Sequence, residues 1–145
     1  MALARIFKPD PGESVDSDLL TAAKTAAHNA YAPYSKFHVG AAVRSKTGHI
    51  YVGANIENVS YPVGICAEAS ALAAARAAEG ANLIVIAILV YAENSEGIQM
   101  PCSPCGACLQ RLLEFGTDYP VTFFDRDGRA QTKTPPQLLP GAFSF

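Results

Sequence analysis

The sequence contains no run of lysine or arginine, no long apolar stretch and no apolar segment near its first residue. Proteins that follow a nucleic-acid backbone usually carry a basic stripe, whereas the net charge here is −2. The longest apolar run, residues 83–91, is too short to cross a bilayer. We therefore expect a cytoplasmic protein of one domain, residues 1–145, whose ligand is a small molecule and not a nucleic acid or a membrane.

Cysteine is scarce, and its placement is informative. The four cysteines are Cys66, Cys102, Cys105 and Cys108, so three of them fall within residues 102–108. In a reducing compartment, clustered cysteines indicate metal binding or catalysis more often than disulfides. We expect these thiols to form a functional site.

The rest of the chain predicts helices that alternate with strands. Residues 18–29 predict a helix capped by Ser17, with one face formed by Leu20, Ala23, Ala27 and Ala30. Further along, the pattern predicts a hairpin (37–44 and 50–54), a helix (66–80), a central strand (83–90), a helix (105–115) and a strand (120–124). This order indicates an α/β fold with one sheet and helices on both of its faces.

Two short motifs carry the chemistry. Cys66-Ala67-Glu68 and Pro104-Cys105-Gly106-Ala107-Cys108 each stand where a helix is expected to begin. Either motif alone is weak evidence, because a lone Cys-x-x-Cys can be a redox pair and a lone cysteine is commonly part of the core. Together they match the (Cys or His)-x-Glu and Pro-Cys-x-x-Cys signature of zinc deaminases.

The spacing suits a catalytic metal. Cys105 and Cys108 can reach one ion, and Cys66 completes a set of three ligands that leaves the fourth position of Zn²⁺ open to water. Glu68 then lies beside the ion without binding it, placed to shuttle a proton from the zinc-activated water. Cys102 with Cys105 has the same spacing, but a proline between them does not fit inside a helix. We therefore interpret Cys102 as a spare thiol in a loop.

The sequence resembles the cytidine deaminase family, in its short, homotetrameric form, over most of its length. The resemblance is carried by Tyr61 and by residues 31–42, 55–58, 66–68, 104–108 and 138–143. It implies a three-layer α/β/α fold with a central mixed five-stranded sheet and one Zn²⁺ per subunit. It also implies the residues that bind the nucleoside: Asn55 and Glu57 at the ribose, Phe37 at the pyrimidine, Tyr61 at the subunit boundary and Phe143 from a neighbouring subunit.

The sequence departs from the family pattern at two positions. Members with cysteine as the first ligand commonly carry arginine directly after the catalytic glutamate and directly after the last cysteine, where this chain has Ala69 and Leu109. Three thiolates on Zn²⁺ leave a charge of −1, which such arginines would offset through hydrogen bonds to the sulfurs. Arg111 and Arg76 are the candidates to replace them.

The predicted activity is that of a hydrolase in pyrimidine salvage, which converts free cytidine or 2′-deoxycytidine to the uridine form and ammonia. A second hypothesis is a zinc deaminase for another amino-heterocycle, such as a nucleoside antibiotic or a free base, although Asn55 and Glu57 favour a sugar. Two hypotheses lie outside this enzyme class. They are a non-catalytic protein that binds zinc or a nucleoside, and a dithiol redox protein that uses Cys102, Cys105 and Cys108.

Overall fold

A computed structural model describes residues 14–144 and shows a mixed sheet at the centre of the chain. The strand order is β2-β1-β3-β5-β6. These strands are β1 (His38–Ser45), β2 (Ile50–Ala54), β3 (Val85–Glu93), β5 (Val121–Phe124) and β6 (Ala130–Lys133). β3 and β5 are parallel, whereas β1 is antiparallel to β2 and β3, and β5 to β6. The predicted five-stranded mixed sheet is confirmed.

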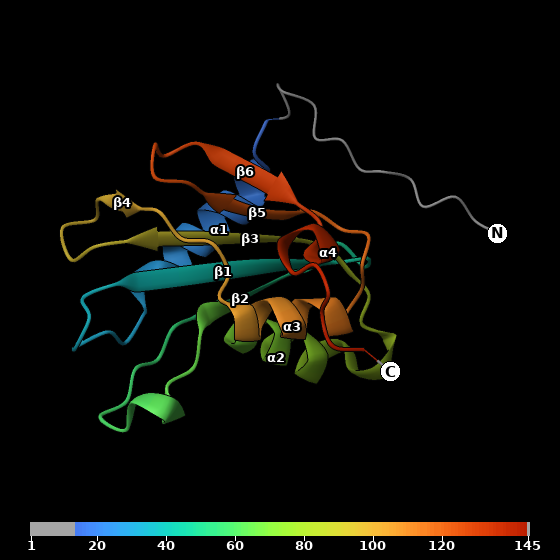
Figure 1. Cartoon of the computed structure of the whole chain (residues 1–145), viewed down its shortest axis with the longest axis horizontal. Helices are drawn as coiled ribbons and strands as arrows, with labels where there is room; N and C mark the ends of the chain where they lie inside the picture. The colour runs from blue at the N-terminus through green and yellow to red at the C-terminus, as the bar shows by residue number, and fades with distance from the viewer. Residues whose placement is uncertain (1–13, 145) are drawn as a thin grey trace.

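The sheet has helices on both faces, as Figure 1 shows. α1 (Ser17–His28) packs on β1 and β3 on one face, and α2 (Ala67–Glu79) packs on β1 and β2 on the other. α3 (Gly106–Glu114) lies beside α2, and the short α4 (Pro135–Leu138) contacts α3. Each face has its own apolar core, because β1 and β3 bury side chains on both sides. The three-layer α/β/α prediction is confirmed.

The start of α1 differs from the sequence prediction. The cap is Asp16, whose carboxylate accepts hydrogen bonds from the amides of Asp18 and Leu19 at 3.1 and 3.0 Å, and Ser17 is the first helical residue. Asp16 is also paired with Arg44 of β1 at 2.8 Å, so the sheet fixes where the helix begins. The buried face accordingly uses Leu19 in place of the expected Leu20, with Ala23, Ala26 and Ala27.

Several short elements were not expected. β4 (Gln99–Met100) is two residues long and pairs with β3 outside the main strand order, as a sixth strand. α4 is a single turn with a capping box between Thr134 and Gln137. The 3₁₀ turns η1 (Tyr61–Val63) and η2 (Gly80–Asn82) complete the described elements. Such elements lack the length that makes a periodic pattern visible in a sequence.

No helix within residues 14–144 combines the length and apolar character needed to span a membrane. The amino-terminal segment, in which we expect no secretory signal, lies mainly outside the described residues.

Candidate active site

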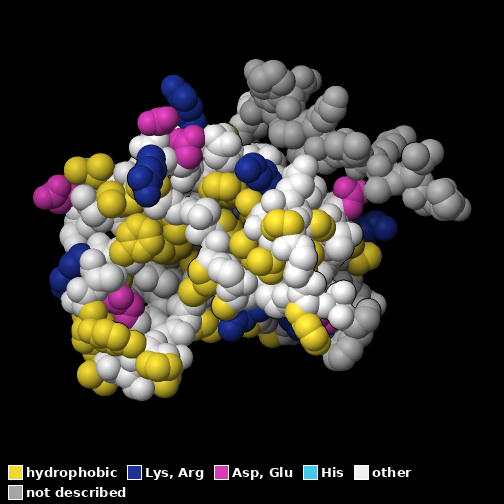
Figure 2. Space-filling model, viewed as in Figure 1, with side chains coloured by type: hydrophobic (Ala, Val, Ile, Leu, Met, Phe, Trp, Pro, Cys, Tyr) yellow, Lys and Arg dark blue, Asp and Glu magenta, His cyan; other side chains and the backbone are white. Residues whose placement is uncertain are grey.

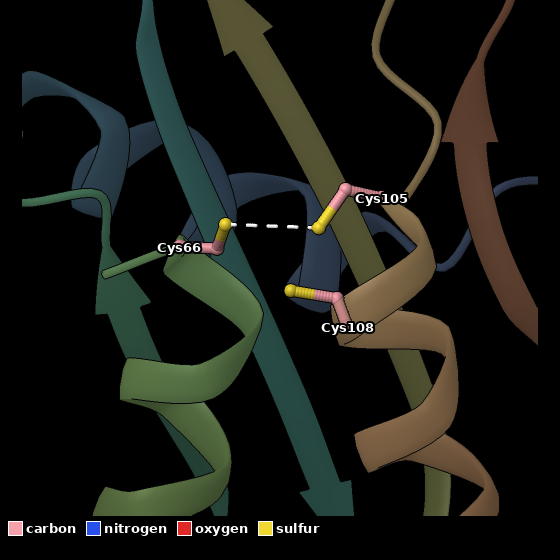
Figure 3. A group of neighbouring side chains, drawn as sticks. All are labelled: Cys66, Cys105 and Cys108. Atoms are coloured by element: carbon pink, nitrogen blue, oxygen red, sulfur yellow. Dashed lines mark hydrogen bonds between the residues drawn. The ribbon is translucent and has the colours of Figure 1, made fainter. Parts of the chain in front are cut away.

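Three cysteine sulfurs converge at the beginnings of α2 and α3. Cys66, Cys105 and Cys108 point toward one another in Figure 3, and their sulfur atoms all lie within 4.8 Å of one another. The Cys66 and Cys105 sulfurs are 3.9 Å apart. Tetrahedral zinc with Zn–S bonds of about 2.3 Å would place two ligand sulfurs about 3.8 Å apart. The three thiols therefore fit one Zn²⁺ ion, and the group does not include Cys102.

The two helices hold these sulfurs through their amino-terminal ends. Cys66 and Cys105 are the N-cap residues of α2 and α3, with extended backbone conformations and no capping bond from their side chains. Cys108 lies in the first turn of α3 and is buried. Helix amino termini carry partial positive charge, which stabilises thiolates.

The thiols also influence one another's ionisation. A hydrogen bond from Cys108 lowers the pKa of Cys66 to about 6, and a bond from Cys105 and the charge of Arg111 add to this against the opposing effect of burial. The same bond to Cys66, together with burial, raises the pKa of Cys108. One thiol of the group thus readily becomes a thiolate, which is the form that binds a metal.

Glu68 is an acid in an unusually buried place. It lies in the first turn of α2, two residues after Cys66, and only 4% of its surface is exposed. Burial raises the pKa of Glu68, and the charge of Cys66 acts in the same direction. A raised pKa favours the protonated form, so this carboxyl group is suited to hold a proton and pass it on.

Cys66, Cys105 and Glu68 lie at the wall of a cavity of about 390 Å³, whereas Cys108 is buried and does not line it. Its lining includes four of the five predicted substrate-binding residues: Phe37, Asn55, Glu57 and Tyr61. This volume lies in the range of small-molecule sites, roughly 300–1,000 Å³. A larger hollow of about 810 Å³ lies between α1 and strands β5 and β6, but none of the predicted site residues lines it.

Asn55 and Glu57 are held firmly by the backbone around them. The Asn55 side chain accepts a hydrogen bond from the Val39 amide at 2.8 Å and donates one to the Phe37 carbonyl at 2.9 Å. One carboxylate oxygen of Glu57 accepts from the amides of Tyr34 and Ser35 at 3.0 and 3.1 Å. These two polar side chains are therefore ordered before any ligand arrives.

The aromatic residues divide between two places. Tyr61 lines the cavity and is 74% exposed, whereas Phe143 lies beside α3 in a separate groove, where Gln110 donates a hydrogen bond to its carbonyl at 3.0 Å. The structure of one chain thus brings Tyr61 to the cavity with Phe37, but not Phe143.

Two polar residues of the cavity wall are not among the predicted site residues. They are Cys102, which the sequence indicates as a spare thiol in a loop, and Ser103. Burial raises the pKa of Cys102 to about 12, and the charge of Glu68 contributes. The signal in the sequence was their position directly before Pro104-Cys105, which keeps them next to a proposed ligand.

The two arginines that could replace the missing ones, Arg76 and Arg111, lie at different distances from the cysteine cluster. Leu109 is buried in the core, and Ala69 is half-buried on α2. Arg76 is in the last turn of α2, where it donates to the Gly80 carbonyl at 2.6 Å. Arg111 lies on α3 one turn beyond Cys108, and its charge acts on both Cys66 and Glu68. Arg111 is therefore the better placed of the two.

The comparison with known proteins agrees with this geometry. Residues 13–123 match the family profile of the cytidine and deoxycytidylate deaminase zinc-binding region. The chain belongs to this deaminase family. Since the family region binds zinc and the three thiols fit that ion, the cofactor is Zn²⁺.

Named relatives in the deaminase family cover most of the chain. The cytidine deaminase of Sporosarcina psychrophila is 41% identical over 127 residues, which are 87% of this chain and 89% of that protein. The cytidine deaminase of Halalkalibacterium halodurans is 43% identical over 127 residues, 87% of this chain and 92% of that protein. The crystal structure of cytidine deaminase from Burkholderia pseudomallei has a TM-score of 0.76 and 38% identity, and it matches 90% of this chain and all of that chain.

A more distant member of the deaminase family bears on the choice of substrate. The blasticidin-S deaminase of Bacillus cereus is 32% identical over 108 residues, 73% of this chain and 76% of that protein. The family therefore includes a protein named for a substrate other than cytidine.

Proposed function

We propose that the chain hydrolytically deaminates cytidine and 2′-deoxycytidine to uridine and 2′-deoxyuridine, with release of ammonia. The observation that carries the proposal is one cavity whose wall holds Glu68, two cysteines of the three-sulfur cluster and the ordered polar pair Asn55 and Glu57. Relatives 41% and 43% identical over 87% of the chain are named cytidine deaminase.

Cys66, Cys105 and Cys108 are the proposed ligands of the zinc ion. Zinc held by three protein ligands supplies an activated water molecule at its fourth position. Cys66 and Cys105 line the cavity, so a substrate bound there would lie beside these two proposed ligands.

Glu68 is the proposed catalytic acid and base. It takes a proton from the attacking water and gives one to N3 of the pyrimidine, while the water oxygen bonds to C4. Glu68 then carries the second proton of the water to the amino group, the C4–N bond breaks, and ammonia leaves. Its burial supports this role, because a raised pKa lets the carboxyl group hold the proton between the two steps.

The remaining residues orient the nucleoside. We assign the sugar hydroxyl to Asn55 and Glu57 and the pyrimidine ring to Phe37, because all three line the cavity that reaches Glu68. A second candidate function, deamination of another amino-heterocycle or nucleoside antibiotic, is supported by the relative named blasticidin-S deaminase. Turnover of cytidine, cytosine and blasticidin S, compared in parallel, distinguishes these substrates.

We also propose that the protein is a homotetramer with its active sites at subunit boundaries, and that it serves pyrimidine salvage in the cytoplasm. The loop of residues 57–65 contributes to the cavity wall and projects from the sheet. Figure 2 shows hydrophobic side chains gathered on this loop. Its exposed apolar residues include Val59 at 79% and Tyr61 at 74%, and Phe143 is 72% exposed. Contact with a neighbouring subunit would remove this apolar area from water. The mass in solution, measured by light scattering, tests the tetramer.

The first experiment is incubation of the zinc-loaded protein with cytidine, with loss of near-ultraviolet absorbance and release of ammonia as the readouts. Conversion to uridine supports the proposal. Lack of conversion with zinc confirmed in place rejects it and favours the second substrate class or a binding role. A chelated sample is the control, since conversion should stop when the metal is removed. Reduction of a disulfide substrate by the metal-free protein would instead indicate dithiol chemistry.

A further inference from the structure

The segment of residues 31–37 runs beside the segment of residues 55–57 and is joined to it through the backbone. The Tyr31 amide donates to the Asn55 carbonyl at 3.0 Å, and the Glu57 amide donates to the Tyr31 carbonyl at 2.8 Å. The residues assigned to the sugar therefore share one rigid unit with the turn that precedes Phe37.

The turn at residues 33–35 forms a cradle for the Glu57 carboxylate. The successive amides of Tyr34 and Ser35 both donate to one Glu57 oxygen, at 3.0 and 3.1 Å. Lys36 follows with φ of +59°, in the left-handed region that lysine seldom adopts. Consecutive amides in such a turn are a common anion-binding arrangement. Backbone strain of this kind is retained where the surrounding structure holds it in place, often at binding sites.

Ser35 links this cradle to the ring-packing residue. Its hydroxyl oxygen accepts a hydrogen bond from the Phe37 amide at 3.0 Å, while the Phe37 carbonyl accepts from Asn55 at 2.9 Å. The hydrogen bonds thus run in sequence through Glu57, Ser35, Phe37 and Asn55. None of these bonds involves the cysteine cluster, so they act on binding of the nucleoside and not on the metal.

We infer that Ser35 is a positioning residue of this deaminase, which holds Glu57 and Phe37 at a fixed separation so that one molecule can place its sugar on the first and its ring on the second. The inference rests on the proposed function, because it takes the sugar and ring assignments from it. Burial would raise the pKa of Glu57, but hydrogen bonds from Ser35 and Tyr34 and the charge of Lys36 hold that pKa below its ordinary value. Glu57 therefore presents an ionised acceptor to a sugar hydroxyl.

The test is steady-state kinetics with cytidine on Ser35→Ala, with Ser35→Thr as the conservative variant and Ser60→Ala as the matched control. Ser60 is an exposed serine in the neighbouring loop whose hydroxyl caps no helix. Ser35→Ala keeps the amide that binds Glu57 but loses the hydroxyl that holds the Phe37 amide and helps to lower the pKa of Glu57. We therefore expect it to raise KM about tenfold with kcat within about twofold. Ser35→Thr keeps the hydroxyl and should stay within about threefold of the parent, and Ser60→Ala should be unchanged.

A double-mutant comparison shows whether Ser35 acts through Glu57. In the Glu57→Gln background, Ser35→Ala should change KM by less than about threefold, because coupled residues are not additive. The same tenfold loss in both backgrounds, or no loss in either, would overturn the inference. If the parent does not deaminate cytidine, the proposed function fails separately, and backbone amide exchange then decides the inference. Ser35→Ala should make exchange at Phe37 faster, and unchanged protection there would reject it.

Discussion

The backbone of Gly53 in β2 lies directly against the backbone of Ala71 in α2. A side chain at position 53 would collide with the Ala71 amide nitrogen and stand 2.6 Å from the Ala67 carbonyl oxygen. Only glycine permits this approach. Because α2 begins next to Cys66 and carries Glu68, the contact also fixes how the site residues stand relative to the sheet.

Gly53→Ala should therefore destabilise the fold more than an ordinary surface change does. We expect a loss of about 2–4 kcal/mol in the free energy of unfolding, since the neighbouring atoms are backbone and cannot move aside. Gly106→Ala is the control, because no atom lies within 4 Å of the added carbon and the site is the first residue of α3. Urea titration measures both. Equal midpoints for the two variants would show that α2 can shift without cost.

Asp16→Ala should weaken the start of α1. Loss of an N-cap costs about 1 kcal/mol at neutral pH, and Asp18→Ala, which removes no capping bond, serves as the control. Burial opposes ionisation of Asp16, but the Leu19 amide and Arg44 outweigh it and keep the pKa of Asp16 below 3.8. The stabilisation is therefore complete above pH 3.8 and is lost as the pH falls through the folded value. The gap between parent and variant in thermal unfolding should close in acid.

The long elements were predictable because each has a periodic pattern. The alanine-rich α2 and the continuous apolar run of β3 are close to their predicted bounds. The start of α1 was misplaced because the bond from Asp16 to Arg44 joins positions 28 residues apart, which no local pattern reveals. β4 was missed for a similar reason, since its two residues are a strand only through pairing with β3.

The chemistry of the site was more visible in the sequence than its surroundings. Cys66, Glu68 and the Cys105–Cys108 pair stand in motifs whose spacing follows from shared helix starts. The cradle made by Tyr34 and Ser35 was not predicted, because its donors are backbone amides, which almost every type of residue has. Phe143 is absent from the cavity of a single chain, so its assignment depends on the proposed tetramer.

Removing one proposed ligand should remove the metal. Cys66→Ser should lower bound zinc from about one ion per chain to near zero, because the remaining two thiols form an incomplete site. Cys102→Ser is the matched control: it changes a cavity cysteine outside the three-sulfur group and should retain zinc. Elemental analysis after dialysis measures both variants. Loss of zinc from the Cys102 variant alone would reassign the ligand set.

Glu68→Gln should separate catalysis from metal binding. The amide has the same shape but cannot move a proton, so we expect kcat to fall by a factor of about 10²–10⁴. Zinc content and thermal stability should stay near those of the parent. Glu114→Gln is the control, since Glu114 is exposed at the end of α3, away from the cavity lining. Turnover of the Glu68 variant close to that of the parent would remove Glu68 from its proposed role.

Arg111 should strengthen zinc binding where the usual arginines are missing. Three thiolates and Glu68 gather negative charge, and Arg111 lies one turn beyond Cys108 on the same helix, with its charge acting on Cys66 and Glu68. Arg76 is ten positions from Cys66, which is about 15 Å along a helix, and it donates to the Gly80 carbonyl.

Arg111→Gln should weaken zinc affinity by about threefold to tenfold. We expect this modest effect because Arg111 is exposed to solvent, which screens its charge. Arg111→Lys should keep most of the affinity, and Arg76→Gln should not change it. Adding Ala69→Arg to the Arg111→Gln variant restores a positive charge directly after Glu68 and should recover the loss. Competition with a chelating dye gives these affinities without any substrate. Equal affinities for the parent and Arg111→Gln would mean that helix ends and neighbouring thiols alone offset the thiolate charge.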